Sequence, residues 1–183
     1  PEELATPQAF KANPLFVLKW YKWRQAIVSQ ASPNPGHFAL AKLESIAAIR
    51  NFQFTLITQN VDGLHQRAGN RNVVELHGNI NRKKCSQCSQ FTELDARNDE
   101  DTLHCKYCDG LLRPDVVWFG ENIPINALQA AWQVAEKCDI FLTIGTSAIV
   151  QPAAQLPIIS LQNGAIVVEI NPNETPNSQY ASF

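Results

Sequence analysis

The chain has 183 residues, 45% of them hydrophobic, which suits one domain or one domain carrying a small insert. Its 15 basic residues are balanced by 17 acidic ones, so it lacks the excess positive charge that a general nucleic-acid binder uses to neutralise phosphates. No apolar run approaches the roughly 18 residues of a membrane span, and the first ten residues show no basic or apolar leader pattern. We therefore expect a monomeric, cytoplasmic protein that binds neither nucleic acid nor membrane.

The first clear helix signal is Asn13-Pro14, because asparagine caps free N–H groups and proline tolerates the first helical position. An apolar stripe then recurs at helical spacing, at Phe16, Trp20, Trp23 and Ile27. On the neighbouring face Tyr21 and Arg24 lie one turn apart and can reach the same point. Taken alone, these two are an edge tyrosine and a solvated arginine.

A turn over 32–36 separates this helix from a second one, which we expect over 37–50. The apolar residues that we expect this second helix to bury are Phe38, Leu43, Ile46 and Ile49. Two short apolar runs follow, at 54–58 and 73–76, and their length and β-branched content favour buried strands.

Polar residues follow the first of these strands directly, at Gln59, Asn60, Asp62 and His65, and the second strand ends on His77-Gly78. In an open α/β sheet the ligand crevice lies just beyond the carboxyl ends of the strands, so these positions favour binding. An ordinary strand, polar loop and strand would have the same pattern.

Four of the five cysteines form two CxxC pairs, Cys85/Cys88 and Cys105/Cys108, separated by sixteen residues. This spacing is typical of a structural four-thiolate zinc site, which has no open position for water. The segment between the pairs is too polar to form a core, so we expect the metal to supply much of its folding energy. A disulfide or redox pair is the alternative in a less reducing setting, and a DNA-binding zinc ribbon is disfavoured by the few basic residues nearby.

The rest of the chain alternates strands and helices. We expect strands over 116–119, 139–144 and 165–170, the last two buried, and helices over 124–137 and 152–163. Gly145-Thr146-Ser147 and Asn171 fall at carboxyl ends of strands, where N–H groups and hydroxyls suit a phosphate or ribose. The alternation predicts a doubly wound parallel sheet with right-handed crossovers.

Five blocks in this order, TQNVDGLH with VVELHG, the CxxC pairs, LRPDVVWFGE, TIGTSAIVQPAA and VVEIN, resemble the sirtuins, the NAD-dependent protein-lysine deacylases. The resemblance covers nearly the whole chain. It implies a Rossmann-like α/β domain at 37–78 and 113–183, a zinc-binding module at 79–112, and an acyl-pocket helical segment at 1–36. It also implies an acyl transfer to ADP-ribose that yields nicotinamide, O-acyl-ADP-ribose and free lysine.

The resemblance assigns residues as well. It gives catalysis to His77, as general base, and to Asn60. Contacts to NAD are implied for Gln59, Asn60, Val61, Asp62, Gly145, Thr146, Ser147, Asn171, Pro172 and Asn173. Contacts to an acyl-lysine protein or peptide, which adds as a strand, are implied for Tyr21, Arg24, Val117, Phe119, Gly120 and Glu121. One structural Zn²⁺ is implied at Cys85, Cys88, Cys105 and Cys108.

Tyr21 with Arg24 resembles the pair by which class III sirtuins hold succinyl- or malonyl-lysine, and an arginine fork suits a carboxylate. One part of the family pattern is not matched, namely the initial strand with its GAG-type glycine-rich loop for the NAD pyrophosphate. We therefore weigh three functions: a deacylase acting on succinyl, malonyl or acetyl groups, a non-catalytic zinc-stabilised module that binds acyl-lysine peptides or a partner, and an ADP-ribosyl transferase.

Overall fold

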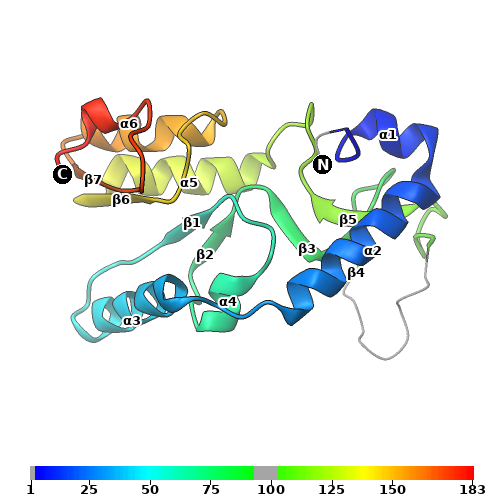
Figure 1. Ribbon diagram of the computed structural model, residues 1–183, viewed down its shortest axis with the longest axis horizontal. Coiled ribbons are helices and arrows are strands. Elements are labelled where there is room, and N and C mark those ends of the chain that lie inside the picture. The colour runs from blue at the N-terminus through cyan, green and yellow to red at the C-terminus, as the bar shows by residue number, and fades with distance from the viewer. Residues whose placement is uncertain (1–2, 93–102) are drawn as a thin grey trace. The chain divides into compact units, whose positions relative to one another are not determined.

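A computed structural model describes residues 3–92 and 103–183 (Figure 1). The chain forms two compact units, Pro1–Ile123 and Pro124–Phe183, and each builds sheets from its own strands. Within the described ranges, no helix is both long and apolar enough to cross a membrane.

Three capped helices open the first unit: α1 (Pro7–Ala12), α2 (Pro14–Gln30) and α3 (Pro35–Ile49). Each begins at a proline, and the residue before it accepts a backbone N–H through its side chain, which satisfies a free donor of the first turn. The predicted helix start at Asn13-Pro14 is confirmed. The sequence carried too weak a pattern to predict α1.

Two short parallel strands hold a polar loop, residues 59–62, at their carboxyl ends; we call these residues the polar loop. β1 (Leu56–Thr58) pairs with β2 (Val73–Glu75), and α4 (Leu64–Ala68) lies between them in the chain. The predicted strands and their parallel direction are therefore confirmed. The end of β1 and the end of β2 lie side by side, which brings residues 59–62 close to His77.

A three-stranded antiparallel sheet follows, in the order β4-β3-β5. Its strands are β3 (Gly78–Cys85), β4 (Phe91–Thr92) and β5 (Leu112–Val116). The predicted strand over 116–119 is wrong in position, because the ladder between β5 and β3 ends at the pair Gly78 and Val116. In the segment 117–119, Trp118 is buried in the core and Phe119 is 56% exposed, so the apolar run does not continue the ladder.

The core of the first unit lies between α2 and this sheet, which run beside each other (Figure 1). On α2, Val17 is 1% exposed and Tyr21 3%, whereas Trp23 is 59% exposed. The other buried members of this core are Phe10, Ile80, Val116 and Trp118. The Val17/Tyr21 face of α2 is thus its core face, and the more aromatic neighbouring stripe is not.

The predicted burial of the apolar residues of α3 is wrong. Phe38, Leu43, Ile46 and Ile49 are between 39% and 82% exposed, and Ala47 is the buried residue of this helix. Helical periodicity shows which side of a helix is apolar, but it does not show whether another element covers that side. Within the first unit, α3 packs on α4.

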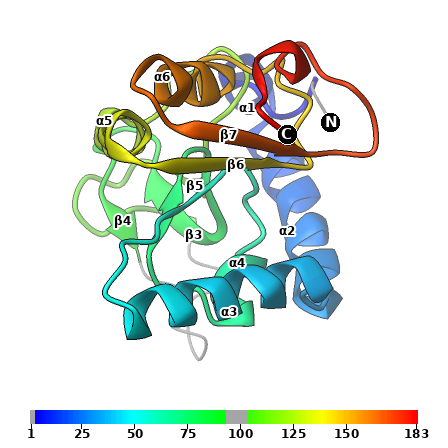
Figure 2. The same cartoon turned by 90° about the vertical axis from the view of Figure 1, so that its left-hand side faces the viewer.

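The second unit contains one parallel strand pair, β6 (Ile140–Ile144) and β7 (Ile166–Ile170), with helices α5 (Ile125–Lys137) and α6 (Leu156–Gln162). The 3₁₀ turns η1 (Ala153–Gln155) and η2 (Ser178–Tyr180) complete it. The strands lie side by side with α6 packed on them (Figure 2). The prediction that both strands are fully buried is wrong. Side chains alternate across a strand, and only the face toward α6 is covered. On that face Thr143 and Val167 are buried, whereas Ile140 and Ile170, on the other face, are exposed.

Candidate functional site

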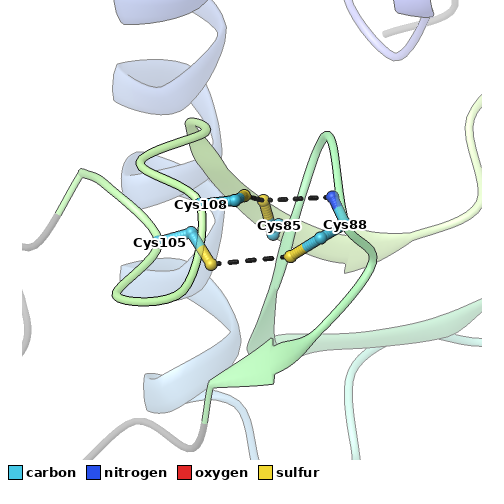
Figure 3. A group of neighbouring side chains, drawn as sticks. All are labelled: Cys85, Cys88, Cys105 and Cys108. Carbon is cyan, nitrogen blue, oxygen red and sulfur yellow. Dashed lines mark hydrogen bonds between the residues drawn. The ribbon is translucent and has the colours of Figure 1, made fainter.

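The four paired cysteines converge on one point (Figure 3). Cys85 ends β3 and Cys88 follows in a tight turn, while Cys105 and Cys108 form a second turn before β5. All four sulfur atoms lie within 4.8 Å of one another, and the Cys85–Cys108 and Cys88–Cys105 sulfur pairs are 3.5 and 3.6 Å apart. Four sulfurs held at 2.3 Å by zinc would be about 3.8 Å apart, so the cluster fits a tetrahedral Zn²⁺ site.

The four thiols are free, not joined in disulfides. Burial disfavours a thiolate at Cys85, but the N–H groups of Cys88 and Gln87 and the neighbouring thiols outweigh burial and lower its pKa to about 6. Such N–H···S contacts stabilise a metal-bound thiolate in the same way. The polar segment between the two cysteine pairs includes residues 93–102, which lie outside the described part of the chain.

The loop after β1 is held by its own polar groups. The Asn60 N–H donates to the hydroxyl of Thr58, and the Leu64 N–H donates to the Asp62 carboxylate at 2.9 Å, which starts α4. The Ile80 N–H donates to the carbonyl of Val61 at 2.8 Å and ties the loop to β3. The loop is thus a fixed platform at the carboxyl ends of the parallel strands.

His77 stands beside this loop with one ring nitrogen engaged. Its Nδ1 lies 3.1 Å from the carbonyl oxygen of Gln59. A carbonyl oxygen can only accept, so Nδ1 carries the proton in the neutral ring, and Nε2 keeps the lone pair of a general base. The half-buried ring is therefore oriented and set in one tautomer by the loop itself.

The main chain around His77 is fixed from the other side by β5 and by Val117, the residue that follows it. The Val117 N–H donates to the His77 carbonyl at 2.9 Å. Gly78 has φ +81°, and a Cβ there would lie 2.1 Å from the carbonyl oxygen of Asp115. Only glycine allows this close approach of β3 to β5.

A partly buried ion-pair network underlies this junction, in which Asp115 is buried and Arg82 is 45% exposed. Asp115, 4% exposed, binds Arg82 at 2.9 Å and Lys84 at 3.3 Å, and Arg82 also binds Glu75 at 2.6 Å. Burial works against the charge of Arg82, but the two carboxylates outweigh it and raise its pKa. The network joins the end of β2 to β3 and β5 around His77.

Arg24 and the polar loop line one cavity of about 300 Å³. Its walls are Arg24, Val28, Gln59, Asn60, Val61, Asp62 and Ile80. The Arg24 guanidinium also lies 5.0 Å from the centre of the Trp20 ring, so it is braced on one face. The structure therefore brings one predicted acyl-side residue together with the predicted NAD loop.

Tyr21 does not line this cavity, although it is one turn from Arg24. Its hydroxyl accepts the indole N–H of Trp118 at 2.8 Å, and burial raises its pKa, which keeps the phenol neutral. Glu121 is likewise engaged within the protein, where its carboxylate accepts hydrogen bonds from Nη1 and Nη2 of Arg113 and from the Trp118 backbone N–H. Phe119 and Gly120 are exposed.

In the second unit, the two predicted cofactor segments meet at one edge. Ile144 pairs with Ile170, so residues 145–147 and 171–173 both leave the carboxyl ends of adjacent parallel strands. The Gly145 N–H donates to the Ile170 carbonyl, and the Asn171 amide donates to the carbonyl of Asn173 at 2.9 Å. This is the edge at which such sheets bind ligands.

The Sir2 family model matches residues 1–152 of this sequence. The chain belongs to the Sir2 family. This Sir2 chain is 53% identical to "NAD-dependent protein deacylase 2" of Pyrobaculum aerophilum over 171 residues, which are 93% of this chain and 67% of that protein. It is 48% identical to "NAD-dependent protein deacylase" of Aquifex aeolicus over 184 residues, which cover all of this chain and 75% of that protein.

Solved Sir2 structures agree with the fold. A complex of a Sir2 homolog with NAD matches with a TM-score of 0.89 at 47% identity, covering 99% of this chain and 70% of that one. Sir2Tm bound to a propionylated peptide matches with a TM-score of 0.84 at 34% identity, covering 98% and 76%. The predicted Rossmann-like α/β class with a zinc-binding insert is therefore confirmed.

Sequence reasoning did not single out Arg113, Asp115, Arg82 or Trp118. The signal that could have found Arg113 and Asp115 is the pair of charges in the otherwise apolar run 111–119, since a charge in such a run needs a buried partner.

Proposed function

We propose that this Sir2 chain is an NAD-dependent protein-lysine deacylase that transfers the acyl group of an acyl-lysine to ADP-ribose and releases nicotinamide and free lysine. The names of the Pyrobaculum and Aquifex relatives support this reaction, as do the NAD and peptide complexes of its structural relatives. The substrates are acyl-lysine proteins or peptides.

The observation that carries the proposal is the hydrogen bond between His77 Nδ1 and the Gln59 carbonyl. It leaves Nε2 as the basic nitrogen, and a base at this position can take the proton of a ribose hydroxyl so that the oxygen can accept the acyl group. Gln59 also belongs to the polar loop that lines the cavity. The same loop therefore orients the His77 ring and forms the wall of the candidate ligand site.

NAD, when bound, supplies a ribose carbon from which nicotinamide can leave. In the first unit Gln59, Asn60, Val61 and Asp62 would hold the nicotinamide ribose and carboxamide, with Asn60 orienting a water. In the second unit Gly145, Thr146 and Ser147, with Asn171, Pro172 and Asn173, would hold the remaining ribose and phosphates. Backbone N–H groups, hydroxyls and amides at a strand's carboxyl end fit these groups chemically.

On the acyl side we propose a preference for acids such as succinyl- and malonyl-lysine. Arg24 lines the cavity, braced on Trp20, and its guanidinium can donate two N–H groups to a carboxylate. Tyr21 lies one turn away but is buried with its hydroxyl bound to Trp118, so Arg24 would be the direct contact to the carboxylate. Val117 and Phe119 would border the acyl chain. The peptide would add as a strand near Gly120.

The test is NAD-dependent release of acetyl and succinyl groups from matched lysine peptides. We expect His77→Ala to reduce the rate on both at least about 100-fold, the usual share of a general base, while zinc content and thermal unfolding stay unchanged. Normal turnover by this variant would refute the assignment.

The acyl preference is tested in the same assay with Arg24→Met. We expect about a 10-fold or greater loss on succinyl-lysine, because a hydrogen-bonded charge pair is lost, and little change on acetyl-lysine. Lys19→Met removes an exposed charge from the same helix and should change neither rate. Equal losses on both peptides in the Arg24 variant would argue against an acidic acyl pocket.

A further inference from the structure

Trp118 is the most heavily restrained residue of the segment that follows β5. Its side chain is 2% exposed and belongs to the core beneath α2. The residues on either side of it are tied by their main chains, Val117 to the carbonyl of His77 and Phe119 to the carbonyl of Ala5, both at 2.9 Å. The segment 117–119 is thus held residue by residue although it lies outside the β3–β5 ladder.

Arg113 and Glu121 both contact Trp118, Glu121 at its backbone N–H and Arg113 at the face of its ring. The Trp118 N–H donates to the Glu121 carboxylate at 2.9 Å, and the Arg113 guanidinium carbon lies 3.1 Å from the centre of the indole ring. Arg113 also donates to both oxygens of Glu121 and to the carbonyl of Val116. Burial opposes the charge of Glu121, but Arg113 and the Trp118 N–H outweigh burial and lower the pKa of Glu121. The ion pair between Arg113 and Glu121 therefore stays charged at neutral pH.

Tyr21 completes the restraint from the helix. The indole N–H of Trp118 can only donate, so the Tyr21 oxygen is the acceptor at 2.8 Å. The two rings are stacked, with centroids 6.3 Å apart. This bond joins residues 97 positions apart and links the helix that carries Arg24 to the segment that carries Val117 and Phe119.

We propose that Trp118 is a positioning residue for acyl-lysine peptides, acting through its hydrogen bond with Tyr21. The pair sets the spacing between the acyl-pocket helix α2, the peptide-pairing segment 117–120 and His77. A peptide that adds as a strand needs donors and acceptors already in line, and a displacement of about 1 Å is enough to lose much of this alignment. The inference rests on the proposed function, because it concerns the segment at which the substrate would bind.

The test is the affinity for an acetyl-lysine peptide, measured by calorimetry without NAD, so that the readout does not depend on turnover. Acetyl-lysine has no carboxylate on its acyl group, so a direct contact between Tyr21 and an acidic acyl group does not enter. We expect Tyr21→Phe and Trp118→Phe each to weaken binding about 2- to 10-fold, the range of one hydrogen bond. Both substitutions remove the same hydrogen bond, so we expect the double variant to have the affinity of whichever single variant binds less tightly.

Trp23→Phe is the matched control, since Trp23 is exposed on the same helix and should leave the affinity unchanged. In nuclear magnetic resonance spectra, Tyr21→Phe should shift one of the four indole N–H signals and leave the fold and the zinc content intact. Losses that multiply in the double variant, or unchanged affinity in Trp118→Phe, would overturn this inference alone. A wild-type chain that binds no acyl-lysine peptide would overturn the proposed function and this inference with it.

Discussion

Replacing Gly78 by alanine should disrupt the junction between His77 and β5. The new Cβ would lie 2.1 Å from the carbonyl oxygen of Asp115 and 2.9 Å from its carbonyl carbon. Both are backbone atoms, so no side chain can turn away, and β5 would have to shift by roughly 1 Å to restore van der Waals contact. Such a shift would stretch the hydrogen bond from Val117 to His77.

The magnitude has two parts. At φ +81° an alanine costs about 1–2 kcal/mol of backbone strain. The shift of β5 removes one or two ladder hydrogen bonds, at about 0.5–1.5 kcal/mol each. We therefore expect Gly78→Ala to lower the free energy of unfolding by about 1.5–5 kcal/mol and to reduce activity through the displacement of His77.

Gly120→Ala separates the two parts. Gly120 has φ +87° and nothing within 4 Å of its would-be Cβ, so this variant carries the strain without the collision. The assay is urea unfolding followed by tryptophan fluorescence, in which three of the four tryptophans, at 20, 23 and 118, report on the first unit. Equal destabilisation in the two variants would refute the close-approach argument.

Two further variants test supports of the site. Cys88→Ser should lower bound zinc from one per chain to near zero and reduce thermal stability. The control is Cys138→Ser, which changes a thiol outside the cluster and should keep the metal. Retained zinc in Cys88→Ser would contradict the four-thiolate site. Glu44→Gln should cost about 1 kcal/mol at pH 7, because the Glu44 carboxylate accepts the N–H groups of Arg71 and Asn72 before β2. Burial opposes the charge of Glu44, but these donors lower its pKa, so its stabilisation is complete above the ordinary value of about 4.3 and is lost as pH falls through the folded value. Urea unfolding from pH 7 to pH 3 should show the wild type and Glu44→Gln converging, and a constant difference would contradict this.

Short sequence motifs predicted secondary structure and the metal site correctly where a residue type has one main structural role. Asn13-Pro14 marked a helix start because few other residues cap and begin a helix. The CxxC pairs predicted a cluster because thiol spacing is set by metal geometry. The parallel strands of both units followed from alternating apolar runs and helices.

Burial and long-range pairing could not be read in the same way. The apolar residues of α3, such as Ile49 at 82% exposed, show that periodicity does not reveal what covers a face. The bond between Tyr21 and Trp118 joins residues that no spacing rule connects. The Gly78 approach to Asp115 depends on where β5 returns, which is a property of the whole first unit.

β3 links the cysteine cluster to the candidate base, because it ends at Cys85 and begins at Gly78, next to His77. Both of these ends pair with β5, Cys85 with Leu112 and Gly78 with Val116. A closed four-thiolate site has no open position for chemistry, so zinc there acts only by holding one end of this strand pair. The other end sets the main chain of His77 through Val117. Metal loss should therefore reduce peptide binding and turnover together, although no zinc ligand lines the cavity of Arg24 and the polar loop.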